Sequence, residues 1–213
     1  MAFTKMDCGT AEDWAALRRA SAAWQARVAE RIKALLGKLA EQRDARAISQ
    51  LDHSLQTATR AVRNGATEEL VVAALCHDIG TAISHENPGA IAAEILKPFV
   101  SDDVYEIVRT HQDFQRAHYH EKFGRSRHTR ERYSKERWFP AAERFADEWD
   151  QASFDPAYAT LPLDYFAPLI DRVFEKPRRQ PRRSHAGAAI GPRGKLLRCL
   201  SRIRRLVSKG REA

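Results

Sequence analysis

The chain has 213 residues, of which 43% are hydrophobic and 30% charged. This length supports one substantial core, and the sequence has no run of about 18 apolar residues that could span a bilayer, so we expect a soluble domain with a tail. The three cysteines, Cys8, Cys76 and Cys199, are widely spaced and odd in number. This pattern excludes a disulfide framework, and without an apolar signal segment at the N-terminus it favours a cytoplasmic protein.

The net charge of +8 is concentrated in the C-terminal part of the chain. Residues 176–213 contain 13 of the 36 lysines and arginines and one of the 28 acidic residues, so their net charge is +12 and that of residues 1–175 is −4. A body that bound nucleic acid would carry a basic surface of its own. We therefore expect no nucleic-acid binding by the body.

Apolar residues recur at helical spacing through almost the whole body, which predicts an all-α fold. Thr10 and Asp13 resemble a capping box, and the first long helix is expected to run from there to about residue 39 and to pack on the core. The segment 116–137 is crowded with charge and is expected to be a surface excursion. Further helices are predicted over residues 48–63, 67–78, 90–96, 104–110, 139–149 and 165–174.

The segment Leu70–Leu75 is apolar on nearly every side, which is typical of a central helix and would place His77 and Asp78 deep in the fold. Burying a neighbouring histidine and aspartate costs several kcal/mol unless each is paired or binds a metal. For an isolated pair, a helix-capping aspartate and a satisfied core histidine would be the simpler interpretation. Another histidine, His53, lies on a second apolar helix, and the two helices together favour a metal site.

The order of these residues resembles the HD superfamily of metal-dependent phosphohydrolases and their oxygenase relatives. More narrowly, it is similar to the bacterial predicted HD phosphohydrolases, a group related to the phosphonate-cleaving mixed-valent di-iron oxygenases and, more distantly, to myo-inositol oxygenase. The resemblance covers about residues 3–175, and it implies an HD-domain helical bundle over residues 1–175 with a metal site in its core. The segments that carry it are HSLQTATRA (53–61), VVAALCHDIG (71–80), IAAEILKPFV (91–100), THQDFQ (110–115) and FADEWDQASFDPAY (145–158).

The resemblance also implies a set of metal ligands. A first divalent ion, Fe, Mn, Co or Zn, would be held by His53, His77, Asp78 and Asp150. Asp78 would bridge to a second ion, which His111 and one further histidine would complete.

That further histidine is replaced by Pro88, which has no side-chain atom able to bind a metal. His85 lies three residues earlier and would substitute if the loop folded back by about one turn; the alternative is an exposed loop histidine. Other departures are Thr81 in place of a lysine after HDIG, and Arg43 and Arg46 in place of an upstream tyrosine and glutamate.

These departures decide how we rank the functions. A di-iron oxygenase that cleaves a C–P or C–C bond needs both ions, whereas one ion can activate water for hydrolysis. We therefore expect a phosphohydrolase that acts, through metal-activated water, on a small anionic substrate such as a phosphorylated or phosphonate-like metabolite. The oxygenase is the first alternative, and an inactive HD-fold module is the second.

Asp78 and Arg109 are the catalytic candidates. Asp78 would bridge the two ions, and an arginine near the ligands would suit a phosphate or carboxylate group. Arg109 is chosen because it lies two residues before His111. The alternative is that Arg109 is an ordinary solvated residue on a helix surface.

Residues 176–213 are expected to form a Pro- and Arg-rich linker followed by a basic tail. Apolar residues between Leu196 and Val207 form a stripe on a possible helix whose other face is basic. A helix of this kind could contact an anionic membrane or nucleic acid. The alternative, which we favour, is a disordered extension outside the domain.

Overall fold

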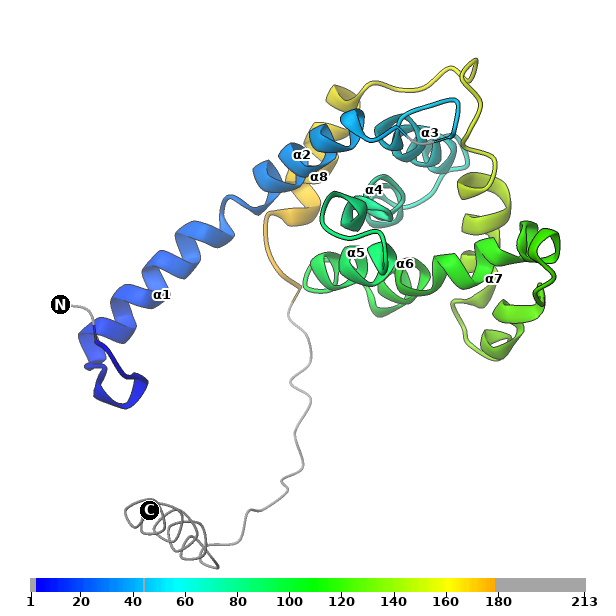
Figure 1. The fold of residues 1–213 in the computed structure, drawn as a ribbon. Coiled ribbons are helices and arrows are strands. Elements are labelled where there is room, and N and C mark those ends of the chain that lie inside the picture. The colour runs from blue at the N-terminus through cyan, green and yellow to red at the C-terminus, as the bar shows by residue number, and fades with distance from the viewer. Residues whose placement is uncertain (1–2, 44, 179–213) are drawn as a thin grey trace, which may run out of the picture. The chain divides into compact units, whose positions relative to one another are not determined.

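The computed structural model describes residues 3–43 and 45–178, and these residues contain helices but no strand (Figure 1). The predicted all-α fold is therefore confirmed. A π-helix, η7, covers Phe145–Asp150, and short 3₁₀ turns connect several of the other elements. The α-helices are α1 (Ala11–Gln25), α2 (Val28–Lys38), α3 (Gln50–Arg63), α4 (Glu68–Cys76), α5 (Pro88–Leu96), α6 (Asp102–Gln115), α7 (Phe139–Arg144) and α8 (Leu163–Phe174).

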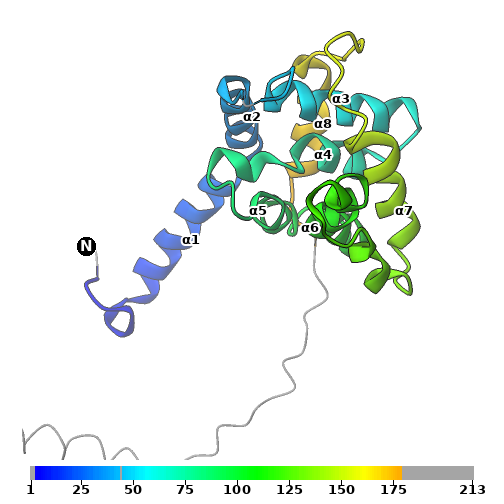
Figure 2. The same cartoon turned by 45° about the vertical axis from the view of Figure 1, so that its right-hand side comes forward.

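Helix α4 is the centre of the fold. Every residue from Val71 to Cys76 is buried, and α3, α6 and α8 pack against this helix (Figures 1 and 2). An apolar helix of only nine residues can be surrounded in this way because it offers no polar face to solvent. The chain leaves α4 at His77, which is fully buried. The central helix thus delivers the His77-Asp78 pair into the core.

Helix α3 has defined signals at both ends. At its start, the Ser49 side chain accepts a hydrogen bond from the backbone N–H of Asp52, whose carboxylate accepts one from the Ser49 backbone. At its end, Gly65 takes a φ of +69°, a conformation that glycine adopts readily. These two signals fix where α3 begins and ends, and His53 is among its buried residues.

Two helices near the site differ from their predicted extents. Helix α6 runs to Gln115, beyond the predicted end at residue 110, because Phe114 continues its buried face. The predicted helix over 139–149 is α-helical only to Arg144 and then becomes the π-helix that ends at Asp150. π-helical turns are rare in proteins, and many of those that do occur lie at functional sites.

The prediction for the first helix is wrong in two respects: the helix is divided in two, and its first half has no residue buried in the core. The helix is interrupted at Ala26 and Arg27. Helix α1 has no buried residue, and the exposed fractions of Leu17 and Trp24 are 47% and 63%. Alanines fill most of the apolar positions of α1, so this helix has little apolar surface to bury. Only α2 packs on the core, through Ile32 and Leu36, beside α8.

The segment 116–137 consists of short 3₁₀ turns whose residues are mostly exposed, as the sequence predicts. Beyond α8, the backbone N–H of Arg178 donates a hydrogen bond to the carbonyl of Pro98 at 2.7 Å. The segment between Leu196 and Val207, for which the sequence left a basic helix and a disordered extension as alternatives, lies outside the described residues. None of the helices in the described part of the chain combines the length and the apolar character needed to cross a membrane.

The contrast between α1 and α2 can be tested with two leucines. Leu36→Ala should lower the free energy of unfolding by about 2–5 kcal/mol because it leaves a cavity in the core. Leu17→Ala, the matched control on α1, should change it by less than about 0.5 kcal/mol. Urea unfolding of both variants measures the two values. Equal losses would mean that α1 packs on the core after all.

Candidate metal centre

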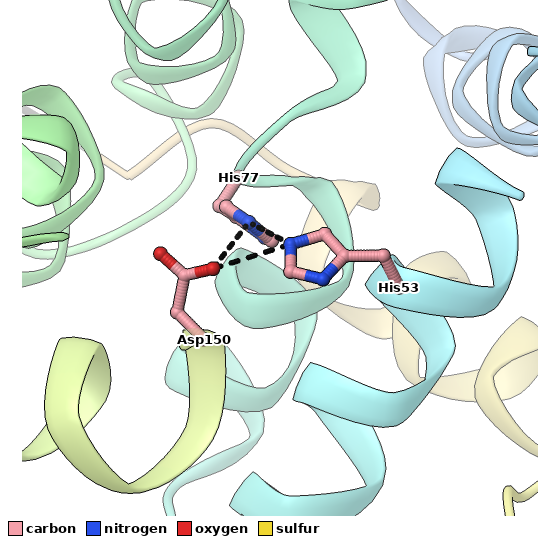
Figure 3. Close-up of side chains that lie close together, drawn as sticks. All are labelled: His53, His77 and Asp150. Atoms are coloured by element: carbon pink, nitrogen blue, oxygen red, sulfur yellow. Dashed lines mark hydrogen bonds and ion pairs between the residues drawn. The ribbon is translucent and has the colours of Figure 1, made fainter. Parts of the chain in front are cut away.

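Three side chains from separate elements meet in the core (Figure 3). His53 comes from α3, His77 from the end of α4, and Asp150 from the end of the π-helix. The Nε2 atoms of the two histidines lie 3.1 Å apart, and Oδ1 of Asp150 lies 3.2 Å from Nε2 of His53 and 3.6 Å from Nε2 of His77. All three side chains are at most 1% exposed. We call these three residues the first group.

Asp78 and His111 extend the cluster on one side. Oδ2 of Asp78 lies 3.5 Å from Nε2 of His77 and 3.8 Å from Nε2 of His53, whereas Oδ1 lies 3.3 Å from Nε2 of His111. His77, Asp78 and His111 form the second group. The two oxygens of Asp78 thus face different histidines, which is the arrangement that a bridging carboxylate requires.

Each of the three histidines is oriented by a hydrogen bond to a backbone carbonyl. These bonds fix the tautomer: Nδ1 carries the donated proton and Nε2 is directed into the cluster. Metal-binding histidines are commonly held in this way. The acceptors are Ser153 for His53 at 2.9 Å, Ala74 for His77 at 2.8 Å and Val108 for His111 at 2.7 Å.

The charges of the cluster depend on one another. Burial alone would lower the pKa of His77, but the carboxylates of Asp78 and Asp150 outweigh this effect and raise its pKa to about 9. Burial would likewise raise the pKa of both carboxyls, but the neighbouring histidines, His77 foremost, hold each pKa below its usual range. In the ion-free protein, protonated His77 therefore supplies the positive charge that a cation would otherwise supply.

The first group fits a divalent ion. Donor atoms about 2.1 Å from a shared ion are separated by roughly 3.0 Å at octahedral angles and roughly 3.4 Å at tetrahedral angles. The separations of 3.1 and 3.2 Å fall in this range, and the third separation, 3.6 Å, lies slightly above it. In addition, Oδ2 of Asp150 is buried and has no hydrogen-bond partner within the described part of the chain. Unpartnered buried polar atoms are rare, and a missing ion is one of their causes.

The structure does not bring His85 to this cluster. His85 is exposed, and neither group of candidate ligands includes it. The loop does not fold back because Pro88 is already the first residue of α5 and is buried. There the backbone of Gly89 packs so closely on His111 that an added Cβ would lie 2.7 Å from Cε1 of its ring. Of the two alternatives that the sequence left open for His85, the structure therefore shows the exposed loop histidine and not a replacement for the ligand missing at Pro88.

Arg109 also lies away from the cluster. Its side chain is 39% exposed and pairs with Glu106, with Nη2 2.6 Å from the carboxylate. Residues two apart on an α-helix point about 200° away from each other, so Arg109 faces solvent when His111 faces the core. Its selection as a catalytic residue is not supported by its position.

Sequence reasoning missed Gln50, whose amide Nε2 donates to Oδ2 of Asp78 at 2.9 Å. The signal was present, because Gln50 precedes His53 by three residues and such residues share a helix face. Phe154 stacks on the His53 ring at 4.5 Å between centroids. The amide Nε2 of Gln115 donates to Oδ1 of Asp150 at 3.2 Å.

Ion binding should stabilise the folded protein. A divalent ion present at 100 times its dissociation constant stabilises the fold by about 2.7 kcal/mol, which raises the melting temperature. Asp150→Asn should abolish the increase seen on adding Mn²⁺ or Zn²⁺ to chelator-treated protein, whereas His85→Ala should keep it. A differential scanning fluorimetry series measures all three proteins. If the melting temperature of His85→Ala did not rise on adding the ion, the placement of His85 outside the site would be contradicted.

Ion affinity should also depend on pH. Below pH 9, an ion must displace the proton from Nε2 of His77 before it can bind there, whereas both carboxyls stay ionised. The affinity should therefore rise by about tenfold per pH unit between pH 7 and pH 9, since one proton is released. Competition titrations with a chromophoric chelator provide the values. An affinity that stays constant over this range would be inconsistent with a protonated His77.

A comparison with protein-family models agrees with this geometry. No curated protein matches the chain. Residues 51–155 match the family model described as HD domain. The matched segment begins within α3 and ends after the π-helix, so it contains all five clustered ligands. The all-helical body with its buried His–Asp cluster is consistent with an HD-domain bundle, and the match over residues 51–155 supports a relationship to the HD-domain superfamily.

Proposed function

We propose that this chain is a metal-dependent phosphohydrolase that acts on a small phosphorylated or phosphonate-like metabolite. The observation that carries the proposal is the first group: two oriented imidazoles and a carboxylate, buried together at separations suited to one divalent ion. HD domains are generally metal-dependent hydrolases. Asp78 would act as the fourth ligand of that ion, through Oδ2.

The ligands differ in their access to solvent, and this difference indicates where a substrate would enter. The Asp78 side chain is 13% exposed, whereas those of His53, His77, His111 and Asp150 are at most 1% exposed. The buried ring of Phe145 packs against the rings of His77 and His111 and excludes water from the inner side of the cluster. We infer that the substrate approaches from the side of Asp78.

An arginine near Asp78 would suit an anionic substrate that approaches from this direction. The guanidinium of the exposed residue Arg46 lies 5.7 Å from the centre of the Phe154 ring and donates a hydrogen bond to Gln50, the residue that contacts Asp78. An arginine binds phosphate oxygens through two parallel N–H groups. Arg46, rather than Arg109, is therefore the arginine that we propose for substrate binding.

The ion and the protein residues would have different roles in the reaction. A bound divalent ion supplies Lewis acidity toward a phosphoryl oxygen and lowers the pKa of a coordinated water. The backbone carbonyls hold the Nε2 lone pairs toward the ion, and Gln115 holds Oδ1 of Asp150. Arg46 would neutralise charge on the substrate and orient it.

A di-iron oxygenase is the second candidate, and the second group is the observation that favours it. His77, Asp78 and His111 also lie within reach of a shared ion. However, the second group shares His77 and Asp78 with the first ion, and only His111 would be its own ligand. Because Pro88 cannot bind a metal and His85 is exposed, the second ion would be held weakly. This deficit ranks hydrolysis first.

The proposed hydrolase predicts turnover of phosphoesters by protein loaded with Mn²⁺, Co²⁺ or Zn²⁺. His53→Ala should lower kcat/KM by at least about 100-fold, because a site that loses one of its few ligands binds its ion weakly. His128→Ala, an exposed histidine outside both groups, is the control and should retain activity. A panel of nucleotides and sugar phosphates, with phosphate release as the readout, measures these effects.

Metal analysis of protein purified without oxygen separates the alternatives. One divalent ion per chain together with phosphate release supports the hydrolase. Two irons per chain with a mixed-valent electron paramagnetic resonance signal would replace it with the oxygenase. Protein that binds no ion and releases no phosphate would be an inactive module of the same fold.

A further inference from the structure

Gln50 is a buried polar residue in direct contact with the candidate metal centre. It is the first residue of α3 and is 2% exposed. Its Nε2 donates a hydrogen bond of 2.9 Å to Oδ2 of Asp78. A carboxylate oxygen has two lone pairs, so this bond occupies one and leaves the other for an ion.

Arg46 determines which way the Gln50 amide points. Its Nη2 donates to Oε1 of Gln50 at 2.5 Å. A guanidinium has only hydrogen-bond donors, so it can donate to the amide oxygen but cannot bond to the amide NH₂ group, which is also a donor. The Gln50 amide therefore presents its N–H to Asp78, whereas the flipped amide would place one oxygen against another. Arg46, Gln50 and Asp78 form a directed chain of hydrogen bonds.

Asp78 needs such a restraint more than the other ligands do. Packing encloses His53, His77, His111 and Asp150 on all sides, but the side chain of Asp78 is 13% exposed. Its two oxygens must stay directed to different histidines, Oδ2 toward His77 and Oδ1 toward His111. Rotation of the carboxylate about its last torsion angle is broad and weakly restrained in the absence of a partner.

We propose that Gln50 is a positioning residue of the metal centre. Its amide, oriented by Arg46, holds the Asp78 carboxylate so that Oδ2 completes the first group and Oδ1 is presented to His111. This inference rests on the proposed function in one respect: it requires that the cluster bind a divalent ion. Loss of a hydrogen-bond partner behind a metal ligand typically lowers metal affinity by about 10- to 100-fold.

The test replaces Gln50 by methionine, which has a similar volume and no donor. Chelator-treated full-length protein is titrated with Co²⁺ alone, and the visible absorption of bound Co²⁺ reports the number and geometry of its ligands. Gln50→Met should raise the Co²⁺ dissociation constant by about 10- to 100-fold and change the absorption spectrum. A purely structural role would leave the spectrum of the bound ion unchanged.

The chain offers a matched control on the same helix. Gln56 is also a 2% exposed glutamine of α3, but its amide bonds to the backbone of Asp155 and not to a ligand. Gln56→Met should keep the dissociation constant within about threefold, since it lacks contact with Asp78. Arg46→Met should weaken Co²⁺ binding, and Arg46→Lys should restore it, because lysine also donates to the amide oxygen.

Circular dichroism melting of the ion-free variants shows whether each one folds, and Gln50→Ala is the second variant if Gln50→Met does not. Wild-type affinity and spectrum in a folded Gln50 variant would overturn the positioning role while leaving the proposed function intact. Equal losses in the Gln50 and Gln56 variants would overturn it as well. Wild-type protein that binds no Co²⁺ would overturn the proposed function and this inference together.

Discussion

The structure is organised around the convergence of imidazole lone pairs and carboxylates in a dry core. Two Nε2 atoms 3.1 Å apart repel each other if both are unprotonated, and Asp78 and Asp150 add negative charge beside them. Such a cluster is costly to bury unless a proton or a cation lies within it. In the ion-free protein His77 carries that proton, and a divalent ion would replace it. The charge that stabilises the core is thus also the charge that the proposed function requires.

The helices are arranged to meet this electrostatic demand. The central helix α4 is short and apolar, so its C-terminal end brings His77 and Asp78 to the point that α3, α6 and the π-helix surround. Each of these neighbours contributes one side chain of the cluster: His53 from α3, His111 from α6 and Asp150 from the π-helix. The three carbonyls that accept from Nδ1 come from Ala74, Val108 and Ser153, so the backbone itself directs the imidazoles. The fold therefore supplies orientation, and the side chains supply the donor atoms.

Asp78 connects the buried cluster with the outside. Its carboxylate lies near residues of both groups and is the most exposed side chain of the cluster. It also accepts a hydrogen bond from the amide of Gln50. The asymmetry between the groups follows from residues that flank it. The first group is complete without the α5 region, whereas the second group meets Pro88 and the Gly89 backbone where another ligand would be needed. One well-held ion, rather than a pair, is the chemistry that these residues favour.

The sequence by itself determined the helical class and the central position of α4, because apolar periodicity is a local property of the chain. The identity of the five clustered residues came from the resemblance of their segments to the HD superfamily. Only the tertiary structure decided which neighbouring polar residues join them. Arg109 and His85 lie close to ligands in sequence but face solvent, since helix phase and the start of α5 turn them away. Gln50 lies 28 residues from Asp78 yet contacts it, because α3 and α4 pack side by side. Such contacts depend on how helices are placed against each other, which no local pattern specifies.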